Sequence, residues 1–251
     1  MSPRLAFALE SLERAGRLTL EYFRAGTTVE TKGDKTPVTI ADREAEALLR
    51  EAIGRAYPGE TILGEEQGLA SGSGEGRWVI DPIDGTKSFI CGVPLYANLL
   101  SYEIDDEPAL AACCFPALGE MIWAERGQGS FLNERPIRVS TRTSLEGAVI
   151  CTASVFGLRR RGVLEQVVAL SERALATRTW CDAYGHAMVA RGAADAMIDP
   201  SVARWDISAM SLIVREAGGR FTDFSGGDAL GAEGLSSNGL LHESVLEVLR
   251  K

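Results

Sequence analysis

Apolar residues recur at helical spacing in the first part of the chain. The segment Pro3–Ala25 has leucines at positions 5, 9, 12 and 20, and residues 41–56 show a similar period. Between these segments, Thr31–Val38 is rich in turn-forming residues, and Thr36-Pro37 lies where a helix entry is expected. The pattern predicts two amphipathic helices that are joined by a turn-rich connection.

From residue 95 onward the pattern changes to short apolar runs that are separated by polar turns. The runs are 95–104, 109–115 and 120–124, and short turns between adjacent strands are typical of antiparallel hairpins. After residue 148, strand-like and helical segments alternate. Strands are predicted at 148–152, 177–181 and 196–198, and helices at 159–176, 184–191 and 207–217. The chain therefore predicts an α/β (α+β) fold with a mixed sheet.

Length and composition are typical of one folded domain over residues 1–251. A chain of 251 residues with 45% hydrophobic residues can bury a substantial core. It carries 26 basic and 35 acidic residues, a net charge of −9, which disfavours nonspecific binding to nucleic acid or to a membrane surface. An anionic substrate stays compatible with this charge because a bound cation can reverse the local potential.

The N-terminal segment does not have the pattern of a signal peptide. Charged residues at positions 10, 13, 14 and 17 interrupt its apolar positions. Nowhere does an apolar run approach the roughly 18 residues that a membrane span needs. We therefore expect a cytoplasmic protein.

The cysteines and histidines do not favour a thiol-based or histidine-based site. The five cysteines form no CxxC pair, and Cys113-Cys114 lies in an apolar run, so free thiols are expected, with this pair in the core. His186 falls in a helical segment and is predicted to pack. His242, near the C-terminus, is predicted to be exposed to solvent.

The stretch Trp78–Phe89 indicates chemistry most clearly. Its apolar run ends in Asp81 and Asp84, and the end of a strand is where α/β folds place functional groups. Closely spaced carboxylates suit a hard divalent cation such as Mg²⁺, and the amides of Gly85-Thr86 at a helix start could hold a phosphate group. Together these features predict a phosphoryl-transfer site. The alternative is that Asp-Pro and Asp-Gly are turn residues only.

Two further acids support the phosphoryl-transfer interpretation. Glu65 follows the short apolar segment 61–63, and Asp206 begins the helical pattern that stops at Gly218-Gly219. Alternatively, Glu65 is a solvated loop acid and Asp206 is a helix N-cap. Turn and cap roles would then have to account for four separately placed acids.

These motifs and their order resemble the inositol monophosphatase-like phosphatases, which depend on Mg²⁺ and are typically lithium-sensitive. The matching segments are Gly64-Glu65-Glu66, Asp81–Thr86, and Trp205-Asp206 with Ala217-Gly218-Gly219. The resemblance implies a layered α/β/α/β/α sandwich and a homodimer. It also implies a metal-binding half over about 1–140 and a C-terminal α/β half over about 141–251.

The resemblance further implies the role of each site residue. Two or three Mg²⁺ ions would be bound by four acids and one backbone carbonyl, namely Glu65, Asp81, Asp84, Asp206 and the carbonyl of Ile83. Gly85 and Thr86 would hold the phosphate oxygens. Thr86 with Asp42, in Thr39-Ile40-Ala41-Asp42, would activate the attacking water, whose pKa the cations lower. The alternative for Asp42 is an acid that interacts with a helix dipole.

Substrate preference is indicated by the residues that follow Asp-Gly-Thr. Lys87-Ser88-Phe89 and the segment Cys181–Gly185 look most like the histidinol-phosphate phosphatase branch, with departures at Cys181 and Ala183. Histidinol phosphate carries a cationic amine, which an acid in the leaving-group pocket would bind. The resemblance places Asp182 and Asp199 in that pocket, where Arg204 would contact the substrate or else form a surface ion pair.

Three alternatives to histidinol phosphate remain. The chain could hydrolyse inositol 1-phosphate or a broad set of sugar phosphates, or 3′-phosphoadenosine 5′-phosphate. A non-catalytic relative that only binds metal and phosphate would be expected to lack some of the acids, and all of them are present here.

Overall fold

The computed structural model describes residues 1–33, 37–180 and 182–251. The helices within these ranges are α1 (Pro3–Ala25), α2 (Ile40–Ala56), α3 (Thr86–Ile90), α4 (Val155–Arg161), α5 (Leu164–Arg173), α6 (Asp182–Ala190), α7 (Arg204–Glu216) and α8 (His242–Leu249). The strands are β1 (Val29–Thr31), β2 (Pro37–Thr39), β3 (Thr61–Gly64), β4 (Gly68–Ala70), β5 (Gly76–Asp84), β6 (Ala97–Ile104), β7 (Glu107–Phe115), β8 (Glu120–Glu125), β9 (Ser130–Leu132), β10 (Arg135–Ile137), β11 (Val149–Thr152), β12 (Ala176–Arg178), β13 (Ala196–Asp199), β14 (Arg220–Thr222) and β15 (Gly234–Ser237).

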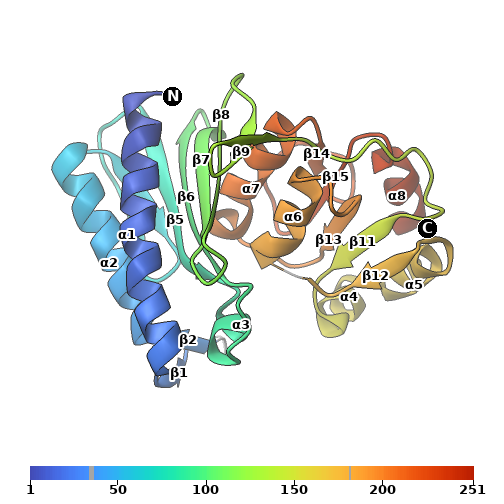
Figure 1. The fold of residues 1–251 in the computed structure, drawn as a ribbon, viewed down its shortest axis with the longest axis horizontal. Coiled ribbons are helices and arrows are strands. Elements are labelled where there is room, and N and C mark those ends of the chain that lie inside the picture. Colours follow the sequence, from blue (N-terminus) through green and yellow to red (C-terminus); the bar gives the residue numbers. More distant parts are fainter. Residues whose placement is uncertain (34–36, 181) are drawn as a thin grey trace.

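Helices and sheets alternate in five layers along the long axis of the molecule (Figure 1). Helices α1 and α2 cover one face of an eight-stranded sheet, and α6 and α7 lie between this sheet and a five-stranded one. Helices α4, α5 and α8 form the outer layer beyond the smaller sheet. The layered α/β/α/β/α sandwich expected from the sequence is confirmed.

The order of strands brings separate parts of the chain to one edge of the larger sheet. Its order is β10-β9-β8-β7-β6-β5-β3-β4, and β3 and β5 are parallel neighbours, with Gly64 opposite Ile80. The carboxyl ends of β3 and β5 therefore lie side by side, which places Glu65 close to Asp81. The predicted hairpins β6–β7 and β7–β8 are antiparallel, as expected.

Helix α1 packs on the larger sheet through a stripe of small and apolar side chains. Its first turn is capped because the Ser2 hydroxyl accepts a 3.1 Å hydrogen bond from the Leu5 amide. Leu5 and Leu12 are fully buried. At Gly16 an added Cβ would lie 3.0 Å from Sγ of Cys114, so glycine permits this close approach of the helix to β7.

One sequence expectation about the elements is wrong, and another is refined. The single helix expected over 159–176 is two helices, α4 and α5, because Gly162 ends α4 in the left-handed conformation with φ 81°. The ends of the turn-rich segment Thr31–Val38 contribute to a two-stranded β1–β2 sheet on either side of residues 34–36.

The expectation for His242 is also wrong, whereas Cys113 and Cys114 are buried as predicted. His242 is fully buried, and its ring nitrogens pair with the hydroxyls of Thr222 (2.9 Å) and Ser237 (2.8 Å). The described cysteines have free thiols, and Cys181 lies outside the described residues. In the described part of the chain, no helix combines the length and apolarity that crossing a membrane requires.

Candidate active site

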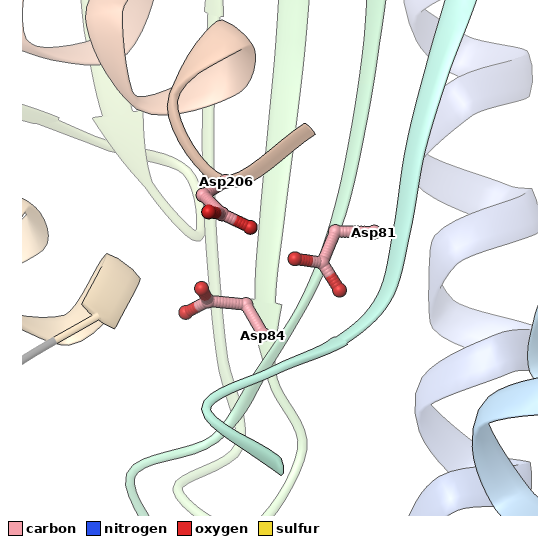
Figure 2. Close-up of side chains that lie close together, drawn as sticks. All are labelled: Asp81, Asp84 and Asp206. Atoms are coloured by element: carbon pink, nitrogen blue, oxygen red, sulfur yellow. The ribbon is translucent and has the colours of Figure 1, made fainter. Parts of the chain in front are cut away.

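Three aspartates from two distant segments meet at the end of β5. Asp81 and Asp84 come from this strand, and Asp206 comes from the first turn of α7. One carboxylate oxygen from each lies within 4.8 Å of the others, and Figure 2 shows the three side chains clustered. We call Asp81, Asp84 and Asp206 the carboxylate group.

A β-bulge explains how two aspartates three positions apart can point the same way. In a regular strand, residues at an odd spacing point to opposite faces. Here Asp81 pairs with Leu99 and Asp84 with Ala97, so three steps along β5 oppose two steps along β6. The Ile83 amide donates a 3.1 Å hydrogen bond to Oδ1 of Asp81, which fixes that carboxylate within the bulge.

Asp206 is held by the start of α7. Its Oδ2 accepts a 2.7 Å hydrogen bond from the amide of Ala203, which is the N-cap residue, so Asp206 stabilises the helix start from the third helical position rather than as the N-cap itself. The buried carboxylate of Glu103 accepts from Ser208 Oγ at 2.6 Å and from Arg204 Nε at 3.0 Å. These contacts fix the first turn of α7 against the larger sheet.

Repulsion and burial destabilise the ionised carboxylate group. Burial, followed by nearby carboxylates, raises the pKa of both Asp81 and Asp84 well above the ordinary value. Shielding from water also raises the pKa of Asp206, to about 7. A divalent cation would relieve this repulsion, and an all-oxygen donor set of this kind fits a hard cation. The residues present therefore fit a metal site.

Glu65 lies beside the carboxylate group but also pairs with a lysine. It lines the same cavity of about 150 Å³ as Asp81, Asp84 and Asp206. Its Oε1 lies 2.8 Å from Nζ of Lys32, which also contacts Glu66 at 2.6 Å. Glu65 is thus placed to act as a ligand if it exchanges this lysine for a cation.

A fully buried glutamate holds the loop that carries Glu65. The carboxylate of Glu46, on α2, accepts from the amides of Glu66 (2.7 Å) and Gln67 (3.0 Å). Arg50 Nε donates to the same carboxylate at 2.7 Å and balances its charge. The position of Glu65 therefore depends on a residue 19 positions earlier that the motifs do not include.

Asp42 and Thr86 are not hydrogen-bonded to each other in the structure. Asp42 is fully buried, and its Oδ2 accepts from both the amide (2.7 Å) and the hydroxyl (2.6 Å) of Thr39, closing a capping box at the start of α2. The hydroxyl of Thr86 donates instead to the carbonyl of Ile83 at 3.1 Å. Within the described structure, Oδ1 of Asp42 is buried without a hydrogen-bond partner. A helix-start role is therefore observed for Asp42, and a role in activating water stays a prediction.

Gly85 connects the bulge to α3 and lies against Asp182. It has φ 77°, a conformation that favours glycine, and an added Cβ would lie 3.0 Å from Oδ2 of Asp182. Gly85, Thr86 and Ile83 all line the cavity of the carboxylate group. The segment expected to hold phosphate thus borders the expected metal site.

A larger cavity of about 410 Å³ adjoins the first one. The two cavities share four lining residues, Asp84, Lys87, Asp182 and Asp206. Asp199, at the end of β13, also lines the larger cavity and is buried. Burial, followed by the charges of Asp182 and Asp206, raises the pKa of Asp199 to about 8. The structure therefore brings Asp182 and Asp199 together beside the carboxylate group.

The structure places Arg204 in an ion pair rather than in either cavity. Its guanidinium contacts Glu103 at 3.0 Å and lies 3.5 Å from Asp106. The ion-pair alternative is thus observed, and a contact with the substrate stays a prediction. Arg204 lies outside the residues that line the two cavities because it precedes Asp206 by two positions on a helix and points to another side.

Several lining residues of the larger cavity were not expected from the motifs. Ser154, Phe156 and Arg160 come from the α4 region, and His186 comes from α6. His186 follows Asp182 by four positions, a helical spacing that puts both on one face. That spacing was a signal in the sequence, but packing was the interpretation given to this histidine.

Comparisons with known proteins agree with this geometry. The profile of the inositol monophosphatase family matches residues 1–251. A histidinol-phosphatase of Chlorobaculum parvum is 41% identical over 99% of this chain and 97% of that protein. A histidinol-phosphatase of Mycobacterium tuberculosis is 39% identical over 96% of each chain. Among solved structures, an IMPase of Thermotoga maritima has a TM-score of 0.90 at 35% identity, covering 99% of this chain and 97% of that one. The chain therefore belongs to the inositol monophosphatase family, whose members are metal-dependent, and is a phosphoric monoester hydrolase.

Proposed function

We propose that this phosphatase converts L-histidinol phosphate to L-histidinol and phosphate. The observation that carries the proposal is the pair of acids, Asp182 and Asp199, lining the cavity next to the carboxylate group. Burial, followed by the negative charges of Asp182 and Asp206, raises the pKa of Asp199 to about 8. A substrate with a cationic amine on its leaving alcohol would offset this charge. Relatives that bear the name histidinol-phosphatase support the same substrate.

The expected ligands of the metal ions are the carboxylate group, Glu65 and the carbonyl of Ile83. We propose two or three Mg²⁺ ions and inhibition by Li⁺. When bound, these cations would neutralise charge on the phosphate and lower the pKa of water. The chain's own residues would position the ester: the amides of Gly85 and Thr86 on the phosphate, and Asp182 and Asp199 on the amine. Asp42, whose Oδ1 has no hydrogen-bond partner in the described structure, would accept a proton from water.

The second candidate substrate is inositol 1-phosphate. The match to the IMPase of Thermotoga maritima favours it. The leaving alcohol is uncharged in that case, so Asp182 and Asp199 would have to act as hydrogen-bond acceptors for hydroxyls. The two substrates therefore differ in whether the larger cavity needs a positive charge.

A comparison of substrates tests the proposal. Phosphate release would be measured with histidinol phosphate, inositol 1-phosphate and 3′-phosphoadenosine 5′-phosphate, with Mg²⁺ and with EDTA. We expect the highest kcat/KM for histidinol phosphate and no turnover in EDTA. A higher kcat/KM for inositol 1-phosphate would favour the second candidate, and full activity in EDTA would refute a metal-dependent mechanism.

A further inference from the structure

His186 has one ring nitrogen that is held by the protein and one that is not. Its side chain is only 1% exposed, yet it lines the larger cavity. Nδ1 lies 2.8 Å from the hydroxyl of Ser236, on β15. Nε2 is buried and has no hydrogen-bond partner among the described residues. Buried polar atoms are nearly always paired in folded proteins, so a partner for Nε2 is to be expected beyond the described residues, and a ligand in the cavity could supply it.

The position of His186 relates it to the two acids of the cavity. It follows Asp182, the first residue of α6, by four positions, and both residues line the larger cavity. Asp199, from β13, lines the same cavity. The ring of Phe221 packs against another side of the imidazole, with 5.4 Å between the two ring centroids. The histidine is therefore fixed in place before any ligand arrives.

Burial keeps the imidazole neutral, because it lowers the pKa of His186 to about 3. A neutral ring offers one donor and one acceptor. The hydroxyl of Ser236 can fill either role, so Nε2 is left as a neutral hydrogen-bonding atom. Such an atom suits an uncharged polar group, whereas the ammonium of a substrate is better matched by Asp182 and Asp199.

We propose that Nε2 of His186 recognises an uncharged ring nitrogen of the leaving alcohol, and that it determines specificity for this part of the substrate. The inference rests on the proposed function, since the imidazole of histidinol phosphate supplies such a nitrogen. Two separate parts of the leaving alcohol are then recognised by different residues. The acids bind its amine, and His186 binds its ring.

Two substrates distinguish recognition of the amine from recognition of the ring. Histidinol phosphate has both the amine and the ring, whereas O-phosphoethanolamine has the amine without a ring. The variant His186→Phe keeps a ring of similar size but removes both nitrogens. We expect it to lower kcat/KM for histidinol phosphate roughly 3- to 10-fold, mainly through KM, as the loss of one neutral hydrogen bond would. The kcat/KM for O-phosphoethanolamine should stay unchanged.

A second variant tests whether a hydrogen-bonding atom at the place of Nε2 is what matters, rather than the imidazole ring as a whole. His186→Gln carries an amide that can reach the place of Nε2, so it should restore part of the kcat/KM for histidinol phosphate. Ser236→Ala keeps Nε2 and removes the partner of Nδ1, so it should have a smaller effect than His186→Phe. Thermal melts of all variants would show that each is folded at the assay temperature.

The outcomes distinguish this inference from the proposed function. If the wild type prefers inositol 1-phosphate, the proposed function fails. The inference about His186 would still be supported if His186→Phe lowered kcat/KM for histidinol phosphate, as a secondary substrate, but not for O-phosphoethanolamine. If His186→Phe raises the Tm and leaves kcat/KM unchanged for every substrate, or lowers all of them equally, the inference is overturned and His186 is structural.

Discussion

The amide of Ala183 donates a 2.7 Å hydrogen bond to Oδ2 of Asp84, which lies 99 positions earlier in the chain. This contact joins the start of α6, beside the larger cavity, to the bulge of β5 that carries two members of the carboxylate group. It also lowers the pKa of Asp84, against the larger effect of burial. A direct hydrogen bond therefore joins the segment expected to bind the leaving group to the segment expected to bind metal.

Replacing Asp84 should raise the stability of the metal-free protein and lower the activity. In the metal-free protein, Asp84→Asn removes one of several mutually repelling buried charges, and the asparagine Oδ1 can still accept from Ala183. We expect a higher Tm in EDTA, a smaller rise in Tm on adding Mg²⁺, and turnover lowered by about 100-fold or more. Thermal melts and phosphate release would measure these effects. Turnover equal to that of the wild type would contradict the metal-ligand role.

The stability of the metal-free protein should fall as the pH rises. The pKa values of Asp206 (about 7) and Asp199 (about 8) in the folded state lie above the ordinary value of 3.8. The folded state therefore holds protons that the unfolded state releases, so the stabilisation is complete below about pH 4 and is lost as the pH rises through 7 to 8. Melts in EDTA from about pH 5 to 9 should show a falling Tm.

Asp199→Asn provides the control for this pH dependence. It should make the decrease of Tm with pH shallower, because one of the titrating groups is gone. A Tm that rises with pH in the wild type, or an identical slope in the variant, would show that these carboxyl groups are not protonated in the folded protein.

Asp182 should determine preference for a charged leaving group. It has φ 58°, which asparagine tolerates, so Asp182→Asn should keep the backbone. A hydrogen bond to a charged group contributes roughly 1.5–3 kcal/mol, so kcat/KM for histidinol phosphate should fall on the order of tenfold to a hundredfold. Hydrolysis of inositol 1-phosphate should be nearly unchanged.

A matched control for Asp182 is Asp105→Asn. Asp105 is exposed and also has positive φ (53°), but it lies in the β6–β7 turn. It should have no effect on either substrate. Equal losses on both substrates in Asp182→Asn would mean that this residue is structural.

Glu46 should act on metal affinity through the loop that carries Glu65. Glu46→Gln keeps the size of the side chain but cannot accept as strongly from the amides of Glu66 and Gln67. We expect the Mg²⁺ concentration for half-maximal activity to rise roughly tenfold, as for other residues that orient metal ligands. Direct Mn²⁺ binding, followed by electron paramagnetic resonance, would measure the affinity without relying on turnover.

Glu51→Gln is the control for Glu46→Gln. Glu51 pairs with Arg55 on the same helix, with the same spacing as Glu46 and Arg50, but its side chain is 64% exposed. We expect no change in Mn²⁺ affinity. If both variants bind Mn²⁺ like the wild type, Glu46 does not position Glu65.

No covalent phosphoenzyme should form during turnover. Burial raises the pKa of Cys114 and Cys151 to about 12 and that of Cys113 well above its ordinary value, so their thiols are not ionised at neutral pH. A variant in which all five cysteines are replaced should retain the chemistry. Intact-mass measurement after acid quench would reveal a phosphoryl adduct, and finding one would refute direct attack by water.

Local motifs predicted the carboxylate group because each of its members lies in a short segment whose pattern is recognisable from the sequence. Asp81 and Asp84 end an apolar strand, and the run to Gly85-Thr86 is continuous in sequence. Asp206 was recognised by its place before a helical pattern. The layers of the fold followed from the family resemblance that these motifs supported.

Long-range contacts were beyond such local patterns. The partner of Arg204 is Glu103, 101 positions away, and nothing near Arg204 indicates it. His242 looked solvated because it is close to the end of the chain, but β14 and β15 supply the hydroxyls that enclose it. Helix α4 ends early because a single glycine adopts a conformation that periodicity does not report.

The bulge of β5 makes the number of residues between Asp81 and Asp84 as important as their identity. Removing Pro82 or Ile83 would restore the regular pairing of β5 with β6, and an insertion would lengthen the bulge; either change would turn one aspartate away from Asp206. Substitutions at these two positions keep the number of residues between the aspartates, so both carboxylates still point toward Asp206. During evolution this segment would accordingly tolerate changes of side chain far more readily than changes of length, whereas the exposed loop at 71–75 is free of that constraint.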